Sequence, residues 1–250
     1  MDLSAILITV AAGIAMGAIN NVAGGAGVLG LLAFEHACGL PLSVANPSTR
    51  PAALAIGLFS FLGYLRAGKR PPARVWLGSL AAIPGAIVGT RLALELPDLV
   101  FRGYLAAIMV ALLVQMLRPR RSGPERPPRP WLAPIGCFLI GVHLGYVQIG
   151  TGLLAILVFT TAYSRDLVSV SAAKSTTVIL ASLTSVHGFW TSDAIRWEPG
   201  LWLALGTAIG AFQASRWAVA KGTAVLRRIV VAIAVLTLVD QLVHIAQLLR

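Results

Sequence analysis

Glycine residues that could help to bind an anion gather in two matching places in the 250-residue sequence. The first cluster contains Gly24, Gly25 and Gly27, and the second is Gly150-Thr151-Gly152. Glycines that interrupt a helix expose backbone N–H groups and the positive ends of helix dipoles, which together bind anions without a charged side chain. Glycines can also simply let two helices approach closely, and this is our interpretation of the isolated pair Gly13 and Gly17.

Polar and charged side chains accompany each glycine cluster. The candidates are Asn46, Thr49 and Arg50 at the start of one apolar run, Lys174, Ser175 and Thr176 at the start of another, and Gln148 beside the second cluster. A lone Ser or Thr in a membrane helix usually bonds a carbonyl one turn earlier. An ionised lysine inside an apolar run, however, needs a counter-charge or a watery cavity. A bound anion would supply the counter-charge for Lys174 or Arg50; the alternative is that these side chains extend to the membrane interface.

Other residues are candidates for proton coupling. His143 and His187 lie within apolar runs, and Asp240 precedes His244 by one helical turn, where a structural pair is the alternative. Cys38 and Cys137 fit no metal or redox spacing, so we expect neither a metal nor a cofactor. Motifs of intramembrane enzymes and the ATP-binding Walker loop are absent, which argues against catalysis and ATP coupling.

Composition places the chain in a lipid bilayer. Hydrophobic residues make up 57% of the sequence and charged residues 12%, and the mean hydropathy is +0.83. The net charge of +11 comes from Lys and Arg that lie mostly between apolar runs. This distribution is typical of membrane topology rather than of nucleic-acid binding. We therefore expect an all-α, multi-pass protein of a bacterial-type cytoplasmic membrane.

The elements that must position the candidate residues are eight apolar runs. They cover roughly residues 3–37, 44–65, 75–94, 99–117, 131–162, 168–190, 199–215 and 226–249. The segment 118–130 is rich in Arg and Pro, so it predicts a basic linker between two transmembrane repeats, 1–117 and 131–250. The repeats match in order: the two glycine clusters correspond, residues 45–49 correspond to 172–176, and Gly85-Ala86 corresponds to Gly210-Ala211.

Charge between the runs predicts that the two repeats have opposite orientations. The gap 66–74 carries four cations, whereas its counterpart around Asp193 and Glu198 is net negative, and the next pair of gaps reverses this pattern. If basic gaps face the cytoplasm, the repeats are inverted. The fifth run must then enter and leave on one side, so we predict re-entrant hairpins broken at the glycine clusters of runs one and five.

These motifs resemble the TauE/SafE sulfite exporter family. The resemblance rests on the glycine break, Gly39-Leu40-Pro41, the helix opening at residues 45–49, the basic gap and the helix end at Gly85-Ala86. The second half repeats the glycine break, the helix opening and the helix end. It implies a permease for sulfite or related sulfonates. The sequence departs from the family where Arg50 and Lys174 add cations to the helix openings.

The sequence as a whole predicts a secondary transporter that moves a small anion by alternating access. The expected partners are a sulfur oxyanion or sulfonate and the lipid bilayer, without nucleic acid; the sequence leaves a homo-oligomer open. Two alternatives remain at this point, a passive anion channel and a membrane assembly subunit without transport activity.

Overall fold

The computed structural model is all-helical in the parts that it describes, residues 1–22, 26–117, 128–164 and 166–221. Its elements are α1 (Leu3–Val22), α2 (Gly27–Leu32), the π-helix η1 (Ala33–Ala37), α3 (Leu42–Ser48), α4 (Arg50–Arg66), α5 (Ala73–Ser79), α6 (Ala82–Glu95), α7 (Asp98–Leu117), α8 (Leu132–Tyr146), α9 (Thr151–Ala162), α10 (Leu167–Thr191) and α11 (Trp197–Lys221). The expected all-α class is confirmed. The eighth apolar run and most of the linker lie outside the described residues.

Helix breaks divide four of the apolar runs. The fifth run is divided into α8 and α9, and Gly150 caps α9 with a φ of +84°, a left-handed conformation that suits glycine. The first run is divided between Val22 and Gly27. Two further breaks, at Thr49 and at Leu80–Ala81, were not predicted. Each comes shortly before a proline, Pro51 or Pro84, which has no N–H to donate to the carbonyl four residues earlier.

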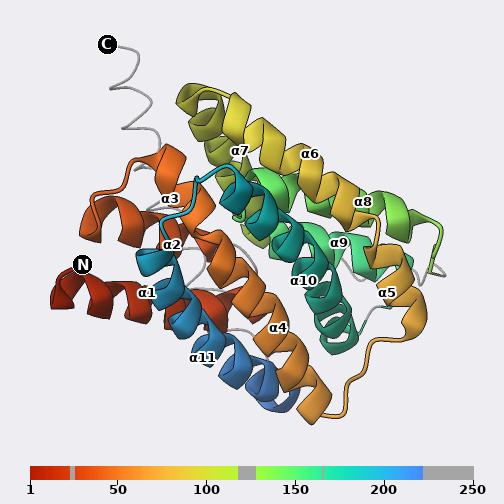
Figure 1. Ribbon diagram of the computed structural model, residues 1–250. Coiled ribbons are helices and arrows are strands. Elements are labelled where there is room, and N and C mark those ends of the chain that lie inside the picture. The colour runs from red at the N-terminus through yellow and green to blue at the C-terminus, as the bar shows by residue number, and fades with distance from the viewer. Residues whose placement is uncertain (23–25, 118–127, 165, 222–250) are drawn as a thin grey trace.

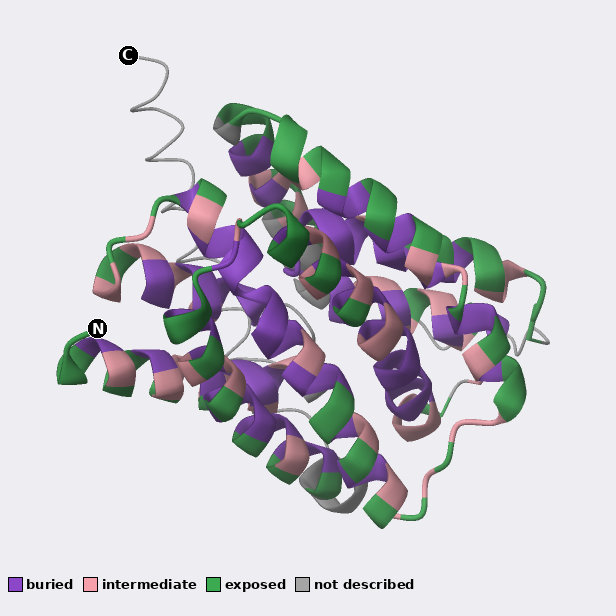
Figure 2. Ribbon diagram, in the orientation of Figure 1, coloured by how far each residue is buried: buried purple, intermediate pink, exposed green. Residues whose placement is uncertain are grey.

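The outer surface of the helices is apolar. Three helical stretches, Leu3–Asn20, Ala73–Glu95 and Leu167–Thr191, are long and apolar enough to cross a membrane. Large apolar side chains on the outside remain exposed, such as Leu3 at 71% and Leu77 at 69%. Figure 2 shows exposed residues along the outer helices and buried residues where the helices face one another. A surface of this kind requires lipid rather than water.

The helices of the two halves pack against each other rather than among themselves. The helix α1 lies along α11, α8 lies along α6, and α4 and α10 are antiparallel neighbours at the centre (Figure 1). Glycines make the two outer pairings close. A Cβ atom added at Gly13 would lie 2.6 Å from the Leu203 carbonyl oxygen, and one added at Gly145 would lie 2.5 Å from that of Ala86. The predicted packing role of Gly13 is therefore confirmed, and Gly17 makes the same kind of approach to Thr207.

Both broken runs fold back on themselves. The backbone N–H of Arg129, before α8, donates to the carbonyl of Thr161 in the last turn of α9 at 2.9 Å. In the first run, the Thr9 hydroxyl lies 3.7 Å from the Cys38 sulfur. The two ends of the fifth run are thus side by side, as a hairpin requires.

Basic residues gather at one end of the molecule. Arg66 and Arg216, from different halves, both lie over the ring of Phe212. At the same end, Lys69 follows the left-handed Gly68 that terminates α4, and its Nζ atom lies 3.8 Å from the carboxylate of Asp166. At the other end of α4, the amino terminus pairs with Glu198 at 3.0 Å and the Ser48 hydroxyl accepts from the Arg196 N–H.

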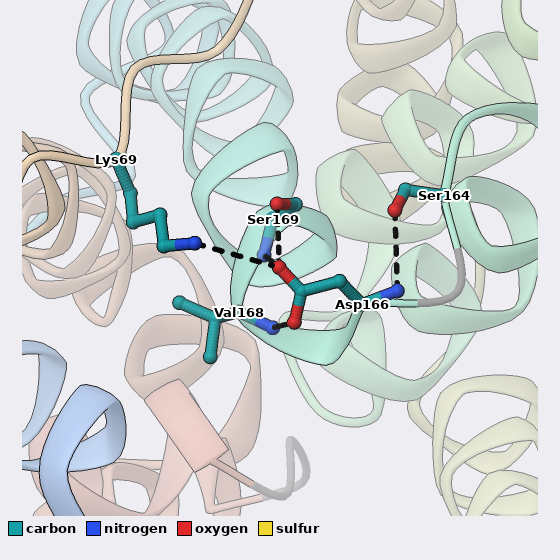
Figure 3. Close-up of polar contacts among 5 residues, drawn as sticks. All are labelled: Lys69, Ser164, Asp166, Val168 and Ser169. Carbon is teal, nitrogen blue, oxygen red and sulfur yellow. Dashed lines mark hydrogen bonds and ion pairs between the residues drawn. The ribbon is translucent and has the colours of Figure 1, made fainter.

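Figure 3 shows why Asp166 is held in place at the basic end. Its carboxylate accepts hydrogen bonds from the backbone N–H groups of Val168 and Ser169 and from the Ser169 hydroxyl, so it caps α10. These bonds, that of the Ser169 hydroxyl first, lower the pKa of Asp166. Lys69 comes from the first half of the chain and Asp166 from the second, so this ion pair joins the two halves.

Candidate functional site

A small cavity with both polar and apolar residues in its wall lies where the end of α1, the middle of α4, the first half of α10 and the break between α8 and α9 come together. Its volume is about 10 Å³, enough for about one water molecule. Five of the residues proposed from the sequence line it: Gln148, Thr151, Gly152, Lys174 and Ser175. The peptide of Asn20 and the hydroxyl-bearing Ser60 complete the polar part of its wall.

The two helix breaks meet beside this cavity. A Cβ atom added at Gly27, where α2 begins, would lie 3.3 Å from Ile149 Cγ1 and 3.5 Å from the Gln148 carbonyl carbon. The start of α2 is therefore packed on the segment that connects α8 to α9. Gly24 and Gly25, the other glycines proposed for the first break, lie outside the described residues.

Lys174 is buried inside the protein, with 4% of its surface exposed. Its Nζ atom donates to the carbonyl oxygen of Asn20, in the last turns of α1, at 2.9 Å. The side chain therefore does not extend to the surface, which was the alternative to an internal role. A cation at this position also opposes the negative end of the α1 dipole.

Arg50, at the start of α4, is fully buried. Its Nη2 atom donates to the carbonyl oxygens of Tyr146 at 3.1 Å and Gly145 at 3.4 Å, at the end of α8, and to Asn46 Oδ1 at 2.8 Å. The Asn46 amide donates to the same Tyr146 carbonyl. Each broken helix thus ends on a buried cation from the opposite half. Arg50 and Asn46 bind helix ends and are not part of the cavity wall.

Two of the three proposed threonines, Thr49 and Thr176, face elsewhere. The Thr49 hydroxyl donates to the Asn46 carbonyl at 2.7 Å. The Thr176 hydroxyl donates to the Ala173 carbonyl at 2.8 Å and lies 3.0 Å from the Ser79 hydroxyl on α5. Ser175 also bonds its own helix, yet it remains in the cavity wall. Side chains that are adjacent in the sequence point in different directions around a helix. The structure therefore brings together only some of the residues predicted at the starts of the two apolar runs.

The two described candidates for proton coupling, His143 and His187, do not line the cavity. His143 is buried, with Nε2 2.7 Å from the Ile149 carbonyl and Nδ1 2.7 Å from the Tyr104 hydroxyl. Because the carbonyl only accepts, we assign the proton to Nε2, and His143 joins α7 to the second break as a neutral ring. His187 is exposed near the end of α10. Asp240 lies outside the described residues.

Sequence reasoning missed Ser60. This serine lies in the middle of α4 with only 2% of its surface exposed, and it lines the cavity together with Lys174. A single serine in an apolar helix carries no signal of its own. The antiparallel pairing of α4 with α10, which brings it opposite the start of α10, could not be read from the chain.

Comparison with known proteins assigns the chain to a family of membrane transporters. The family model for the sulfite exporter TauE/SafE matches residues 9–240. A similar protein is the "Probable membrane transporter protein ORF9" of Sinorhizobium sp, which is 26% identical over 223 residues, covering 88% of this chain and 85% of that protein. No solved structure matches. With a match over most of its length, the chain belongs to the sulfite exporter TauE/SafE family of membrane transporters.

Proposed function

We propose that the protein is a secondary transporter that carries a small sulfur-containing anion, sulfite or a sulfonate, across the cytoplasmic membrane. The observation that carries the proposal is the burial of Lys174 in the wall of a cavity at the meeting point of two helix breaks. The α9 N-terminus, at Thr151 and Gly152, adds the positive end of a helix dipole to the same cavity. Both features favour a negatively charged solute.

An inverted repeat is part of the proposal. If the two halves are related by a two-fold axis, α1 corresponds to α8 and α11 corresponds to α6. The α1–α11 pair then has its counterpart in the α8–α6 pair, and α4 and α10 lie beside the axis. The two buried cations fit the same relation between the halves. Arg50 of the first half binds the end of α8, and Lys174 of the second half binds the end of α1. Inverted repeats of this kind support alternating access by rocking of one half against the other.

The proposed orientation follows from charge. Arg66, Lys69 and Arg216 lie at one end of the helices, and we assign this end to the cytoplasm by the positive-inside rule. The α8–α9 hairpin would then enter from the cytoplasm, and the α1–α2 hairpin from the opposite side, with both breaks at membrane depth. Irregular backbone at that depth needs protein or a cavity around it, and both breaks are packed against each other and beside the cavity.

Transport of labelled anions into proteoliposomes tests the proposal. We expect saturable uptake of sulfite or a sulfonate by the wild type and a loss of roughly tenfold or more in Lys174→Ala, because the buried cation is removed. Arg70→Ala, at an exposed position of the basic end, is the control with normal uptake. Equal uptake by Lys174→Ala and the control would refute the site.

The same assay separates the alternatives. A passive channel would show flux that follows voltage without saturation or coupling to another ion. An assembly subunit would show no uptake of any anion by the purified wild type.

A further inference from the structure

The cavity beside Lys174 contains two side chains whose buried polar atoms have no hydrogen-bond partner in the described part of the chain. They are the Ser60 Oγ atom and both Oε1 and Nε2 of Gln148. Ser60 is 2% exposed and Gln148 is 4% exposed. Leaving such a group unbonded costs about 1–3 kcal/mol, so buried polar atoms nearly always have a partner in the working protein.

Ser60 differs from most hydroxyl residues in these helices. The hydroxyls of Ser48, Thr49 and Ser175 each bond a carbonyl three or four residues earlier in the chain. This local bond is the usual state of Ser and Thr inside a helix. The Ser60 hydroxyl makes no such bond, although it is in the same kind of environment. Its donor is therefore available to a molecule in the cavity.

The charge of the cavity wall limits what that molecule can be. Among the described residues that line the cavity, Lys174 is the one that carries a formal charge, and none of them is acidic. The α9 N-terminus contributes about half a positive charge. Burying an ion is favourable only when its charge is balanced. One cation and one helix end balance a single negative charge, whereas a second would remain uncompensated. Arg50 is bound to the α8 carbonyls instead.

We propose that this cavity selects singly charged oxyanions, with Ser60 and Gln148 donating hydrogen bonds to the anion oxygens and Lys174 balancing the charge. The inference rests on the proposed transport function and adds the charge of the substrate and Ser60 as a binding residue. Because the cavity holds about one water here, α4 and the α8–α9 break must separate to admit the anion.

Two nearly isosteric probes test the charge selection. Methanesulfonate and sulfate are both tetrahedral, but sulfate carries one more negative charge. We expect purified wild type in proteoliposomes to take up labelled methanesulfonate, and to take up sulfate at least tenfold more slowly at the same concentration. Competition by unlabelled sulfate should be correspondingly weak.

Ser60→Ala tests the role of the hydroxyl, with Ser182→Ala as the matched control. Ser182 is likewise buried in a helix with an unbonded Oγ atom, but it does not line the cavity. A hydrogen bond to a charged group contributes about 1.5–3 kcal/mol, so we expect Ser60→Ala to raise the KM for methanesulfonate about tenfold or more. Its thermal unfolding in detergent should stay unchanged, since no protein contact of the hydroxyl is lost.

The outcomes separate the inference from the proposed function. Equal uptake of sulfate and methanesulfonate, or equal KM values for Ser60→Ala and Ser182→Ala, would overturn the inference while leaving an anion transporter. A lower unfolding temperature in Ser60→Ala with an unchanged KM would assign the serine a structural role. Absence of saturable uptake of any sulfur oxyanion by the wild type would remove the proposed function itself.

Discussion

Two buried cations, Arg50 and Lys174, bind the carbonyl ends of helices. Arg50 and Lys174 could not be assigned from the sequence, where a bound anion and the membrane interface were both open. In the structure each one contacts backbone carbonyls of the opposite half. Their positions differ in one respect: Lys174 also lines the cavity, and Arg50 does not. We therefore expect their substitutions to have different effects.

Arg50→Ala should reduce stability more than substrate affinity. The substitution leaves the Tyr146 carbonyl with the Asn46 amide alone and the Gly145 carbonyl without this donor, in a region closed to water. Each hydrogen bond from a charged donor contributes about 1.5–3 kcal/mol. The unfolding temperature measured in detergent should decrease strongly. Arg50→Lys should recover part of it, because a lysine supplies a charge but not the planar set of donors. An unfolding temperature equal to that of the wild type would contradict this role.

Asp166→Ala should weaken the start of α10 in a manner that depends on pH. An N-cap residue contributes about 0.5–2 kcal/mol. The pKa of Asp166 is lowered in the folded protein by the Ser169 hydroxyl and by backbone N–H groups, so its stabilisation is present above the ordinary value of 3.8. The stabilisation is lost as the pH falls through the lowered folded value. Unfolding curves of the variant and the wild type should therefore converge in acid. Asp166→Asn, which still accepts hydrogen bonds, is the control that retains most of the stability at neutral pH.

Helix pairs set the distances between the candidate residues. The α6–α8 pair is close because Gly85, Gly89, Gly141 and Gly145 carry no side chains, and the α1–α11 pair is close for the same reason. The sequence identified the apolar runs to within a few residues of the observed helices, because apolar length determines a membrane helix. It did not reveal which runs are neighbours, since that depends on contacts between residues far apart in the chain.

Gly145→Ala should separate α6 from α8. The new Cβ atom would lie 2.5 Å from the Ala86 carbonyl oxygen and 2.8 Å from the Thr90 nitrogen, both of which are backbone atoms. Overpacking of this kind costs about 1–3 kcal/mol. The matched control is Gly103→Ala in α7, where nothing lies within 4 Å of the added atom. The control should be neutral or slightly stabilising, because alanine favours helix. Equal unfolding temperatures for the two variants would show that α6 and α8 are not in close contact.

The whole molecule is divided into halves that contact each other at both ends. The contacts at the basic end include the ion pair between Lys69 and Asp166 (Figure 3), and those at the opposite end include the Ser48 hydroxyl bonded to the Arg196 N–H. The sequence predicted the basic end from charge, whereas the ion pair depends on how the loop after α4 reaches α10. If the halves rock, at least one of these contacts must open during each cycle.

Cross-linking Lys69→Cys to Asp166→Cys should stop transport reversibly. In a variant whose native Cys38 and Cys137 are replaced, a short reducible thiol cross-linker between these positions would hold the basic end closed. We expect uptake into proteoliposomes to fall to background and to return after reduction. A cross-link between Ser164→Cys and Ser169→Cys, within one half, is the control that should leave uptake unchanged. Normal uptake by the fully cross-linked pair would exclude movement at this end.

The binding of each broken helix by a cation from the other half also bears on how the protein is assembled. A chain of residues 1–117 made alone would leave the Asn20 carbonyl without Lys174, and residues 131–250 alone would leave the Tyr146 carbonyl without Arg50. Neither fragment is self-sufficient, so the two should be recovered together when they are co-produced as separate polypeptides.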